Sequence, residues 1–337
     1  MSEPVRVTIY DVARESGVSP ATVSRALSQP QKVHPHTLAL VLAVVDRLGY
    51  RRNAFARSAG SPRTGTIAMV VPDITNPYYS EAIHGAERRA QAADIGLVLA
   101  NTGEDPARER AVLERLIGRV DGFVLTSSRL SDAEVTALSD RASVVLLNRH
   151  VEGISCSLVD QDQGSQRIIT HLAALGHTRM AYAGGPSSSW VRHQRWNALS
   201  GSAQSHELEI RQLGPFRPSL EDGPAAAEEV LRAGATAVVA HNDLLAIGII
   251  RHVQGNGLAV PADLSVVGYD DMFVSRFCTP PLTTLGGQYE SAAHHGVEML
   301  VEGRRNQLVV LPSSLAIRES TGPAPGATPC TSSSLRP

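Results

Sequence analysis

From residue 64 onwards, short runs rich in β-branched residues alternate with longer amphipathic segments, and this alternation constrains the fold strongly. The expected strands are 66–71, 97–101, 122–126, 144–147, 180–183, 237–240 and 264–268. The expected helices lie near 80–93, 105–117, 131–141, 164–175, 191–204, 222–233, 243–255 and 288–302. Such spacing predicts parallel sheets that helices cover on both faces. Sheets of this kind bind ligands beyond the carboxyl ends of their strands.

The first fifty residues carry a helical pattern instead. Apolar residues repeat at helical spacing on both sides of Gly17, at Ile9, Val12, Ala13, Val23, Ala26 and Leu27. Gly17 suits the left-handed backbone that ends a helix, Ser19 suits the cap of a second helix, and Pro20 suits its first position. The pattern predicts two short helices joined by a tight turn and a third helix over about 35–48 that packs against them.

The second of these helices leaves a face of small residues and one cation. That face carries Ala21, Thr22, Ser24 and Arg25. Small polar groups at a helix start suit contact with phosphates, and an arginine can read base edges in the major groove of DNA. An ordinary helical hairpin with a solvated face is the alternative that these residues leave open.

Charge is divided unevenly along the chain. Residues 1–63 contain nine Lys and Arg against four Asp and Glu, which gives +5, and the remainder contains 22 against 29, which gives −7. A small basic module on an acidic body is typical of a head that binds a polyanion. The overall formal charge of −2 conceals this asymmetry.

Polar and aromatic residues cluster just after the expected strand ends. The candidate ligand-binding residues are Asp73, Tyr78, Tyr79, Asn148, Asp160, Trp190, Arg195, Phe216, Asn242 and Asp270. Aromatic faces stack on sugar or base rings, carboxylates and amides bond hydroxyl groups, and a guanidinium can bridge two oxygens. This mixture suits a small hydroxylated ligand, and its aromatic members would also tolerate a flat purine. Alternatives remain open: Asn242 and Asp160 as helix caps, Tyr78 as a packing residue, and Trp190 as a cover of the subdomain interface.

Several function classes lack their motifs in this chain. It has no nucleophile elbow, zinc-protease helix motif, phosphate loop or dinucleotide-binding glycine pattern, so catalysis is not expected. Cys156, Cys278 and Cys330 are too few and too widely spaced for a disulfide framework or a cysteine metal site. No apolar run has the length of a membrane span, and no export signal is apparent. These observations predict a cytoplasmic protein that contacts no membrane and needs no cofactor.

Residues 8–27 resemble the opening helix-turn-helix of the lactose-repressor/galactose-repressor (LacI/GalR) family of bacterial transcription regulators. The resemblance continues in family order across about 310 residues. It is carried by Leu48-Gly49-Tyr50, Asn53-Ala54-Phe55-Ala56-Arg57-Ser58, Gly65-Thr66-Ile67, Val71-Pro72-Asp73, Asn76-Pro77-Tyr78-Tyr79, Val120-Asp121-Gly122, Leu175-Gly176-His177, Asn242-Asp243, Ser265-Val266-Val267-Gly268-Tyr269-Asp270-Asp271 and Pro280-Pro281-Leu282-Thr283-Thr284.

The resemblance implies an all-α helix-turn-helix head plus an α/β two-lobed core like that of periplasmic binding proteins, with parallel sheets. The implied division is a DNA-binding domain over 1–49, a hinge linker over 50–63 and an effector-binding and dimerisation core over 64–320. Within the core, one subdomain takes about 64–160 plus 288–310, and the other takes about 161–287 plus 311–320. Crossings between the two are expected near 148–162, 283–288 and 310–316, and the tail 321–337, rich in Pro, Gly, Ser and Thr, is expected to be disordered.

The resemblance also implies roles for single residues on DNA and in the cleft. In the head, Arg25 and Ala21 would face base edges, Thr8, Tyr10, Ser19, Thr22 and Ser24 would hold phosphates, and Pro20 would start the recognition helix. In the hinge, Asn53 would help to anchor the segment on DNA. Ala59 stands where the family has a leucine that wedges into the minor groove, and alanine offers far less apolar area for this. In the cleft, the resemblance raises Arg195, Asp270 and the Tyr78-Tyr79 pair above the other candidates.

These observations predict a homodimeric transcriptional regulator, a repressor rather than an activator. It would bind a pseudo-palindromic operator in double-stranded DNA and respond to a small effector, a sugar or sugar derivative, in the cleft. Two alternatives remain open. One is a repressor that no effector controls, which the missing hinge leucine favours, and the other is a sugar-binding receptor without DNA binding.

Overall fold

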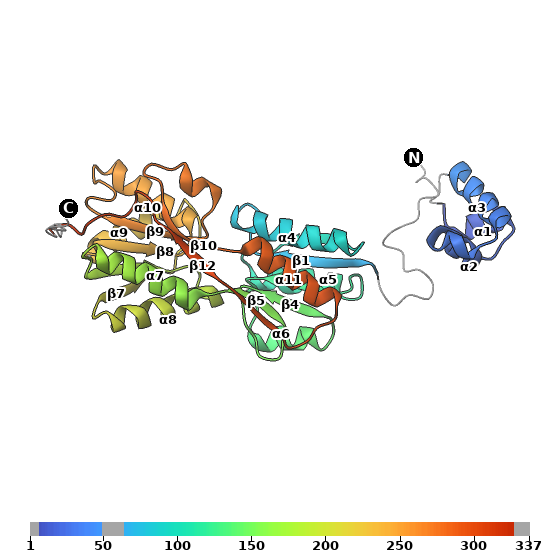
Figure 1. Cartoon of the computed structure of the whole chain (residues 1–337), viewed down its shortest axis with the longest axis horizontal. Coiled ribbons are helices and arrows are strands. Elements are labelled where there is room, and N and C mark those ends of the chain that lie inside the picture. The colour runs from blue at the N-terminus through green and yellow to red at the C-terminus, as the bar shows by residue number, and fades with distance from the viewer. Residues whose placement is uncertain (1–6, 49–63, 327–337) are drawn as a thin grey trace, which may run out of the picture.

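The computed structural model describes residues 7–48 and 64–326, which form a three-helix head and a two-lobed α/β body (Figure 1). The head contains α1 (Ile9–Ser16), α2 (Pro20–Ser28), the short 3-10 helix η1 (Pro30–Lys32) and α3 (Pro35–Leu48). Their apolar sides meet in a small core of Val12, Ala13, Val23, Ala26, Val41 and Val44. The three predicted helices are confirmed.

Local chemistry sets both helix starts in the helix-turn-helix. The Thr8 hydroxyl oxygen accepts from the Asp11 amide at 3.4 Å, and the Asp11 carboxylate accepts from the Thr8 amide at 2.9 Å, which makes a reciprocal capping box. Gly17 ends α1 with a φ of 67°, in the left-handed region. Ser19 caps α2 by accepting from the Thr22 amide at 3.1 Å. The predicted turn chemistry at Gly17 and Ser19 is therefore confirmed.

The first lobe of the body, the N-lobe, is built on a parallel sheet with the strand order β11-β5-β4-β3-β1-β2. Its strands are β1 (Thr66–Val71), β2 (Gly96–Asn101), β3 (Phe123–Thr126), β4 (Val144–Leu147), β5 (Cys156–Val159) and β11 (Leu308–Leu311). Helices α4 (Tyr78–Ala92) and α11 (Tyr289–Val301) pack on one face, and α5 (Pro106–Leu116) and α6 (Asp132–Ser139) pack on the other.

The second lobe, the C-lobe, has the strand order β12-β10-β9-β8-β6-β7. Its strands are β6 (Arg179–Ala183), β7 (Glu209–Leu213), β8 (Ala237–Ala240), β9 (Ser265–Tyr269), β10 (Thr283–Gly287) and β12 (Ser313–Ala316). Helices α7 (Gln161–Ala174) and α8 (Trp190–Ser205) cover one face, and α9 (Gly223–Arg232) and α10 (Asp243–Gly255) cover the other. The β10–β12 pair is antiparallel, and the other strand pairs of this sheet are parallel.

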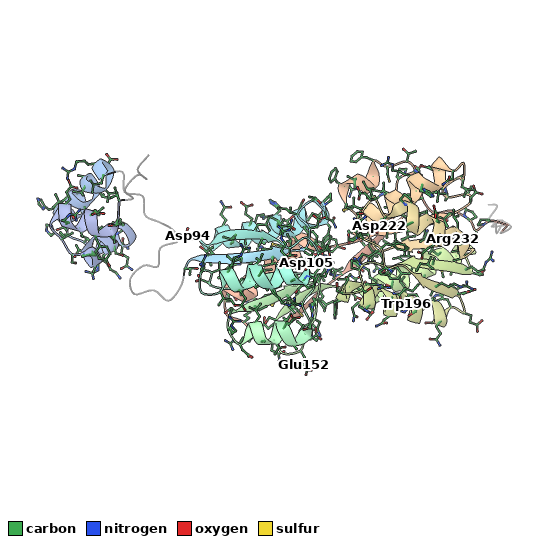
Figure 2. The ribbon with its side chains drawn as sticks, turned by 180° about the vertical axis from the view of Figure 1, so that it is seen from behind. Asp94, Asp105, Glu152, Trp196, Asp222 and Arg232 are labelled. Atoms are coloured by element: carbon green, nitrogen blue, oxygen red, sulfur yellow. The ribbon has the colours of Figure 1, made fainter. Side chains whose placement is uncertain are left out.

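The chain passes between the lobes at Asp160 after β5, at Gln288 after β10 and at Pro312 between β11 and β12. Each position falls within one of the three expected crossing ranges. Figure 1 shows the lobes side by side, and Figure 2 shows them from behind, with Glu152 on the N-lobe and Trp196 and Arg232 on the C-lobe. Three separate connections thus join the lobes.

The structure departs from the expected elements in several places. Strand β7 is not among the predicted strands, because its sequence Glu-Ile-Arg-Gln-Leu is mostly polar and lies at the edge of the sheet. Helices α4 and α7 begin at 78 and 161, a little earlier than predicted. None of the helices in 7–48 and 64–326 combines the length and the apolar character that crossing a membrane requires.

The segment from residue 321 is not disordered where the structure describes it. The Ala324 amide donates to the Leu175 carbonyl at 2.8 Å, and the Gly322 carbonyl lies 3.1 Å from Nε2 of His177. For 321–326 the prediction of disorder is wrong, because composition alone does not reveal these long-range hydrogen bonds. The hinge over 50–63 and the tail over 327–337 lie outside the described residues.

Candidate functional site

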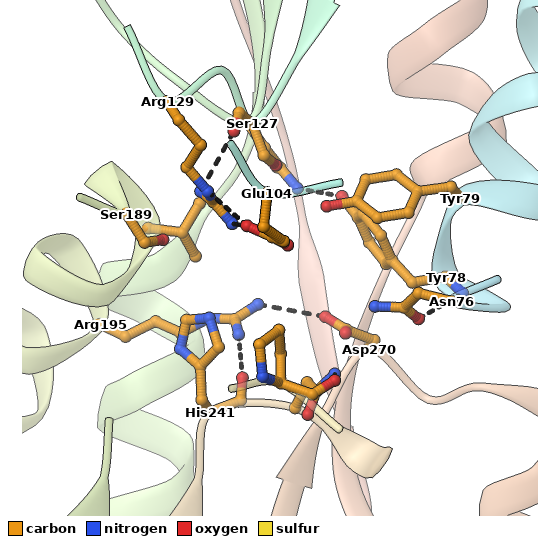
Figure 3. Close-up of a pocket in the computed structure, with 14 residues that line it drawn as sticks. Asn76, Tyr78, Tyr79, Glu104, Ser127, Arg129, Ser189, Arg195, His241 and Asp270 are labelled. Atoms are coloured by element: carbon orange, nitrogen blue, oxygen red, sulfur yellow. Dashed lines mark hydrogen bonds and ion pairs between the residues drawn. The ribbon is translucent and has the colours of Figure 1, made fainter. Parts of the chain in front are cut away.

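A cleft lies between the two lobes, at the carboxyl ends of their strands (Figure 3). It is lined by Asn76, Tyr78, Tyr79, Glu104, Ser127, Arg129 and Asn148 of the N-lobe, and by Ser189, Val191, Arg195, Pro218, His241, Asn242 and Asp270 of the C-lobe. Each of these residues follows the end of a strand, which is where open parallel sheets place their ligands. The lining is mainly polar, so a ligand here would be bound by hydrogen bonds as well as by aromatic contacts.

Arg195 projects from α8 into the C-lobe side of the cleft, where it is buried. Its guanidinium carbon lies 4.0 Å above the Tyr269 ring, and its Nη2 donates to the Asp270 carboxylate at 3.1 Å. It also donates to the side-chain oxygen of Gln161 at 3.3 Å and to the main-chain carbonyl of His241. Burial opposes the positive charge, but Asp270 and the surrounding tyrosines together outweigh this effect, so the pKa of Arg195 is raised.

Asp270 follows β9 with a φ of 104°, a left-handed backbone that turns its side chain into the cleft. Its amide donates to the Leu285 carbonyl at 2.7 Å, which anchors this turn on β10. Burial raises the pKa of Asp270, and Arg195 opposes the rise by stabilising the carboxylate. The two side chains therefore form a buried pair whose charges cancel.

A second arginine–carboxylate pair lies on the N-lobe side of the cleft. Nε of Arg129 donates to Glu104 at 2.6 Å, and Nη1 donates to the Ser127 carbonyl at 3.1 Å. The Arg129 amide donates to the Glu109 carboxylate at 2.9 Å, and this hydrogen bond holds the loop after β3 in place. Burial raises the pKa of Glu109, and the Ser128 hydroxyl and the Arg129 amide oppose the rise.

Three tyrosines form an aromatic corner at the N-lobe side. The Tyr78 ring meets the Tyr79 ring edge-on at 4.8 Å between centroids and the Tyr289 ring at 4.6 Å. The side-chain amide of Asn148 donates to the Tyr78 hydroxyl. Burial raises the pKa of all three phenols, so each keeps its proton at neutral pH. Tyr78 and Tyr79 thus combine packing with a place in the cleft lining.

Six of the ten predicted ligand-binding residues line the cleft: Tyr78, Tyr79, Asn148, Arg195, Asn242 and Asp270. Asn242 also caps α10, because its Oδ1 accepts from the Leu245 amide at 3.0 Å while its Nδ2 donates to the Pro218 carbonyl at 3.1 Å. Both readings of Asn242 are therefore compatible with its position.

Four predicted ligand-binding residues lie outside the lining. Asp73 accepts from the amide of Thr75 at 2.9 Å within its own turn. Asp160 caps α7 through the Gln163 amide at 2.9 Å, as the alternative interpretation held. Phe216 is buried in the apolar core between the sheet and α9 and α10, and Trp190 begins α8 as a half-buried residue. Their positions after strands are as expected, but a local turn, a helix cap and core packing use the side chains of Asp73, Asp160 and Phe216.

The cleft lining includes residues that sequence reasoning did not select: Asn76, Glu104, Ser127, Arg129, Ser189, Val191, Pro218 and His241. All lie in loops after strand ends except Val191, which lies in the first turn of α8, so position after a strand was the available signal. Among 7–48 and 64–326, no cluster of three His, Cys, Asp or Glu residues has the geometry to hold a metal ion.

The head presents part of the predicted DNA face. Tyr10 is 71% exposed, and Ala21 and Arg25 on α2 are exposed as well. The hydroxyls of Thr8 and Ser19 serve as helix caps, and Thr22 bonds Ser19 at 2.9 Å. Pro20 begins α2 and Ser24 lies within it, whereas Asn53 and Ala59 lie outside the described residues.

Comparisons with known proteins match both modules. Residues 8–53 match the family described as bacterial regulatory proteins, lacI family, and residues 169–321 match the periplasmic binding protein-like domain. Catabolite control protein A of Staphylococcus xylosus is 31% identical over 94% of this chain and 99% of that protein. The regulator GalS of Salmonella typhimurium is 32% identical over 90% of this chain and 91% of that protein.

Solved structures give the same result. The Lac repressor dimer bound to operator and the anti-inducer ONPF has a TM-score of 0.80 and 26% identity, and covers 94% of this chain and 100% of that chain. The complex of the regulator CelR with cellobiose has a TM-score of 0.68 and 27% identity over 94% of this chain and 100% of that chain.

A helix-turn-helix head joined to a two-lobed core with a polar cleft defines the class of transcriptional regulators that carry their own sensory domain. The chain belongs to the LacI family of bacterial regulatory proteins. It is a DNA-binding transcriptional regulator, as its relatives are, and not an enzyme.

Proposed function

We propose that this protein is a homodimeric repressor that binds a pseudo-palindromic operator and is controlled by a sugar or sugar derivative in the cleft. The support is the similarity along nearly the whole chain to a Lac repressor dimer on operator and to CelR with cellobiose. The observation that carries the ligand part is the polar cleft, with its two arginine–carboxylate pairs and its tyrosine corner. Such a regulator acts on chromosomal DNA, so we place it in the cytoplasm.

In this proposal Arg25 and Ala21 read base edges, while Thr8, Tyr10, Ser19, Thr22 and Ser24 contact phosphates around the start of the recognition helix at Pro20. The exposure of Tyr10, Ala21 and Arg25 supports the assignment. Asn53 and Ala59 contact DNA from the hinge over 50–63. The head over 1–49 and the core over 64–320 are separate functional units.

The ligand acts by changing the balance between two arrangements of the lobes. It contacts both walls of the cleft, so its affinity depends on the angle between them. A ligand that binds one arrangement better shifts the dimer toward it and so changes operator affinity, and operator binding changes ligand affinity by the same factor. Tyr78, Tyr79, Asn148, Arg195, Asn242 and Asp270 are the proposed contacts.

The operator part is tested by selecting sites from a random DNA library with the full-length protein. Recovery of a pseudo-palindrome is expected, because two-fold protein symmetry requires two half-sites. Arg25→Ala should then weaken binding to the selected site by about 1–3 kcal/mol, the worth of one good base contact. Ligand affinity should stay unchanged, and parallel loss of ligand binding would contradict separate modules.

The ligand part is tested by a thermal-shift screen against monosaccharides, disaccharides, sugar phosphates, sugar acids and nucleobases. A ligand at about a hundred times its dissociation constant adds about 2.7 kcal/mol of stability. The same shift should vanish in Asp270→Ala, because this change leaves Arg195 without its carboxylate. If no compound shifts the protein and a palindrome is still selected, the protein is a repressor without effector control.

A further inference from the structure

His241 is a cleft residue whose surroundings fix its position closely. It follows β8 and is 6% exposed. Its amide donates to the Ala183 carbonyl at 2.8 Å, and its own carbonyl accepts from Arg195. On the ring, Nδ1 lies 3.0 Å from the hydroxyl oxygen of Tyr182, on the neighbouring strand β6. The imidazole therefore has little freedom to turn.

The surroundings also keep this imidazole uncharged. Burial lowers the pKa of His241 well below its ordinary value, and the nearby guanidinium groups of Arg195, Arg129 and Arg192 lower it further. A neutral imidazole has one nitrogen that donates and one that accepts. Which of the two carries the proton is set by the partner at Nδ1.

The hydrogen bond with Tyr182 determines which imidazole nitrogen of His241 carries the proton. The phenol of Tyr182 is buried and burial raises its pKa, so the hydroxyl keeps its proton. In the described part of the chain the hydrogen-bond partner of this hydroxyl is Nδ1 of His241. If Nδ1 carried the proton instead, the Tyr182 hydroxyl proton would be left without an acceptor, and an unsatisfied buried donor is unfavourable. The proton of the imidazole therefore lies on Nε2.

Nε2 has no protein partner in residues 7–48 and 64–326, and Gly185 packs closely against the imidazole ring. A Cβ on Gly185 would lie 2.5 Å from Nε2 and 2.7 Å from Cε1, closer than atoms pack. Gly185 follows β6, so a glycine at the end of one strand makes room for the histidine at the end of the next. The ring thus lines the cleft with an unused donor.

The charges of the cleft point to the kind of group that this donor meets. Among the charged residues that line it, Arg195 is paired with Asp270, and Arg129 is paired with Glu104. A carboxylate or phosphate on the ligand would carry an additional negative charge into the cleft. Since both arginines of the lining are already paired with carboxylates, no cation would be left to compensate the loss of hydration of that charge. A hydroxyl group needs only a donor and an acceptor.

We propose that His241 is a specificity-determining residue that donates a hydrogen bond from Nε2 to an oxygen of an uncharged, hydroxyl-bearing ligand. The inference deepens the proposed function and rests on its ligand-binding part. It predicts that the cleft prefers a neutral sugar to the phosphate or acid of the same sugar.

The first experiment needs no ligand. Nitrogen-15 spectra of the histidine side chains in the full-length protein, assigned with His241→Gln, report the protonation state of each ring. We expect a neutral ring with its proton on Nε2 at about pH 7, and Tyr182→Phe should release this preference. A proton on Nδ1, or an imidazolium at this pH, would overturn the proposal.

The second experiment compares matched probes by titration calorimetry: glucose, galactose, ribose and cellobiose against glucose 6-phosphate, galactose 6-phosphate, ribose 5-phosphate, glucuronate and galacturonate. The neutral member of a pair should bind more tightly. His241→Ala and Gly185→Ala should weaken its binding by about tenfold, the effect of losing one hydrogen bond. His241→Gln, whose amide can donate, should restore part of the affinity.

Two matched variants serve as controls. His206→Ala removes an exposed histidine, and Gly201→Ala adds a methyl group where a Cβ meets no atom within 4 Å. Neither should change probe affinity, and thermal melts establish that each variant is folded. The inference would be overturned if a charged probe bound more tightly than its neutral counterpart. It would also be overturned if His241→Ala and Gly185→Ala left the affinity for the neutral probe unchanged. In both cases the proposal that a ligand controls the protein would still hold. Failure of all probes to bind would contradict the sugar-ligand proposal and this inference together.

Discussion

At the scale of single residues, Arg195 shows how the C-lobe wall is held in place. One planar group stacks on Tyr269, pairs with Asp270 and bonds the carbonyl of His241. A lysine has neither the planar face nor the several fixed donors, so Arg195→Lys would not preserve these contacts. The wall is therefore rigid before any ligand arrives, which reduces the ordering that binding requires.

His177 gives a residue-scale prediction about pH. Its ring is fully buried, with Nδ1 at 2.9 Å from the Thr236 hydroxyl and Nε2 at 3.0 Å from the Ser265 hydroxyl. Burial lowers the pKa of His177. In acid the unfolded chain therefore takes up a proton that the folded protein resists, and stability falls as the pH drops below about 6.5.

The measurement is urea unfolding at about pH 7.5 and about pH 5.5 of the wild type, His177→Ala and, as a control, His206→Ala. At the higher pH, His177→Ala should be less stable by about 1–3 kcal/mol, because it removes the hydrogen bonds of a fully buried ring and leaves a cavity in its place. At the lower pH this difference should shrink, and His206→Ala should behave as the wild type does. If the stability difference between the wild type and His177→Ala were the same at both pH values, burial of His177 would not be a source of acid destabilisation.

At the scale of elements, the crossing of α4 and α11 depends on a glycine. A Cβ on Gly85 would lie 2.8 Å from the carbonyl carbon of Glu290, which belongs to the first turn of α11. Main-chain atoms of a helix cannot turn aside as a flexible side chain can. Gly85→Ala should therefore push the two helices apart and destabilise the protein by about 1–3 kcal/mol.

Gly201 in α8 offers the matched comparison, since a Cβ there meets no atom within 4 Å. Gly201→Ala should stabilise the protein by about 0.5–1 kcal/mol, because alanine favours a helix over glycine. Urea midpoints of the two variants should thus move in opposite directions. Equal shifts of the same sign would show that helix propensity, rather than the close approach to Glu290, governs position 85.

The elements also show how far sequence reasoning reaches. Helix caps and turns such as Ser19 and Gly17 were predictable because their chemistry is local. Strand β7 was not, because an edge strand with polar residues lacks the alternation of a buried one. For the cleft, the end of each strand indicated where to look. Whether a side chain lines the cleft, as Arg129 does, or caps a helix, as Asp160 does, depends on long-range packing that spacing does not reveal.

At the scale of the whole molecule, the distribution of charge separates DNA binding from ligand binding. The +5 of residues 1–63 belongs to the part that meets DNA, and the −7 of the remainder repels the phosphate backbone. The cleft, in contrast, pairs its arginines with carboxylates and has no net charge in its lining. Binding of DNA and binding of a neutral ligand should therefore respond differently to salt.

Operator binding should weaken steeply as salt rises, because each phosphate contact releases a counterion. With about 6–10 phosphate contacts in a dimer, affinity for the selected operator should fall by about 10³–10⁵-fold between about 50 and about 200 mM salt. Affinity for a neutral sugar should change little over the same range, since no net charge is neutralised when it binds. Fluorescence anisotropy with labelled operator and calorimetry with the sugar measure the two slopes on the same full-length protein. A flat slope for DNA would contradict phosphate contact by the basic head, and a steep slope for the sugar would show that its site carries uncompensated charge.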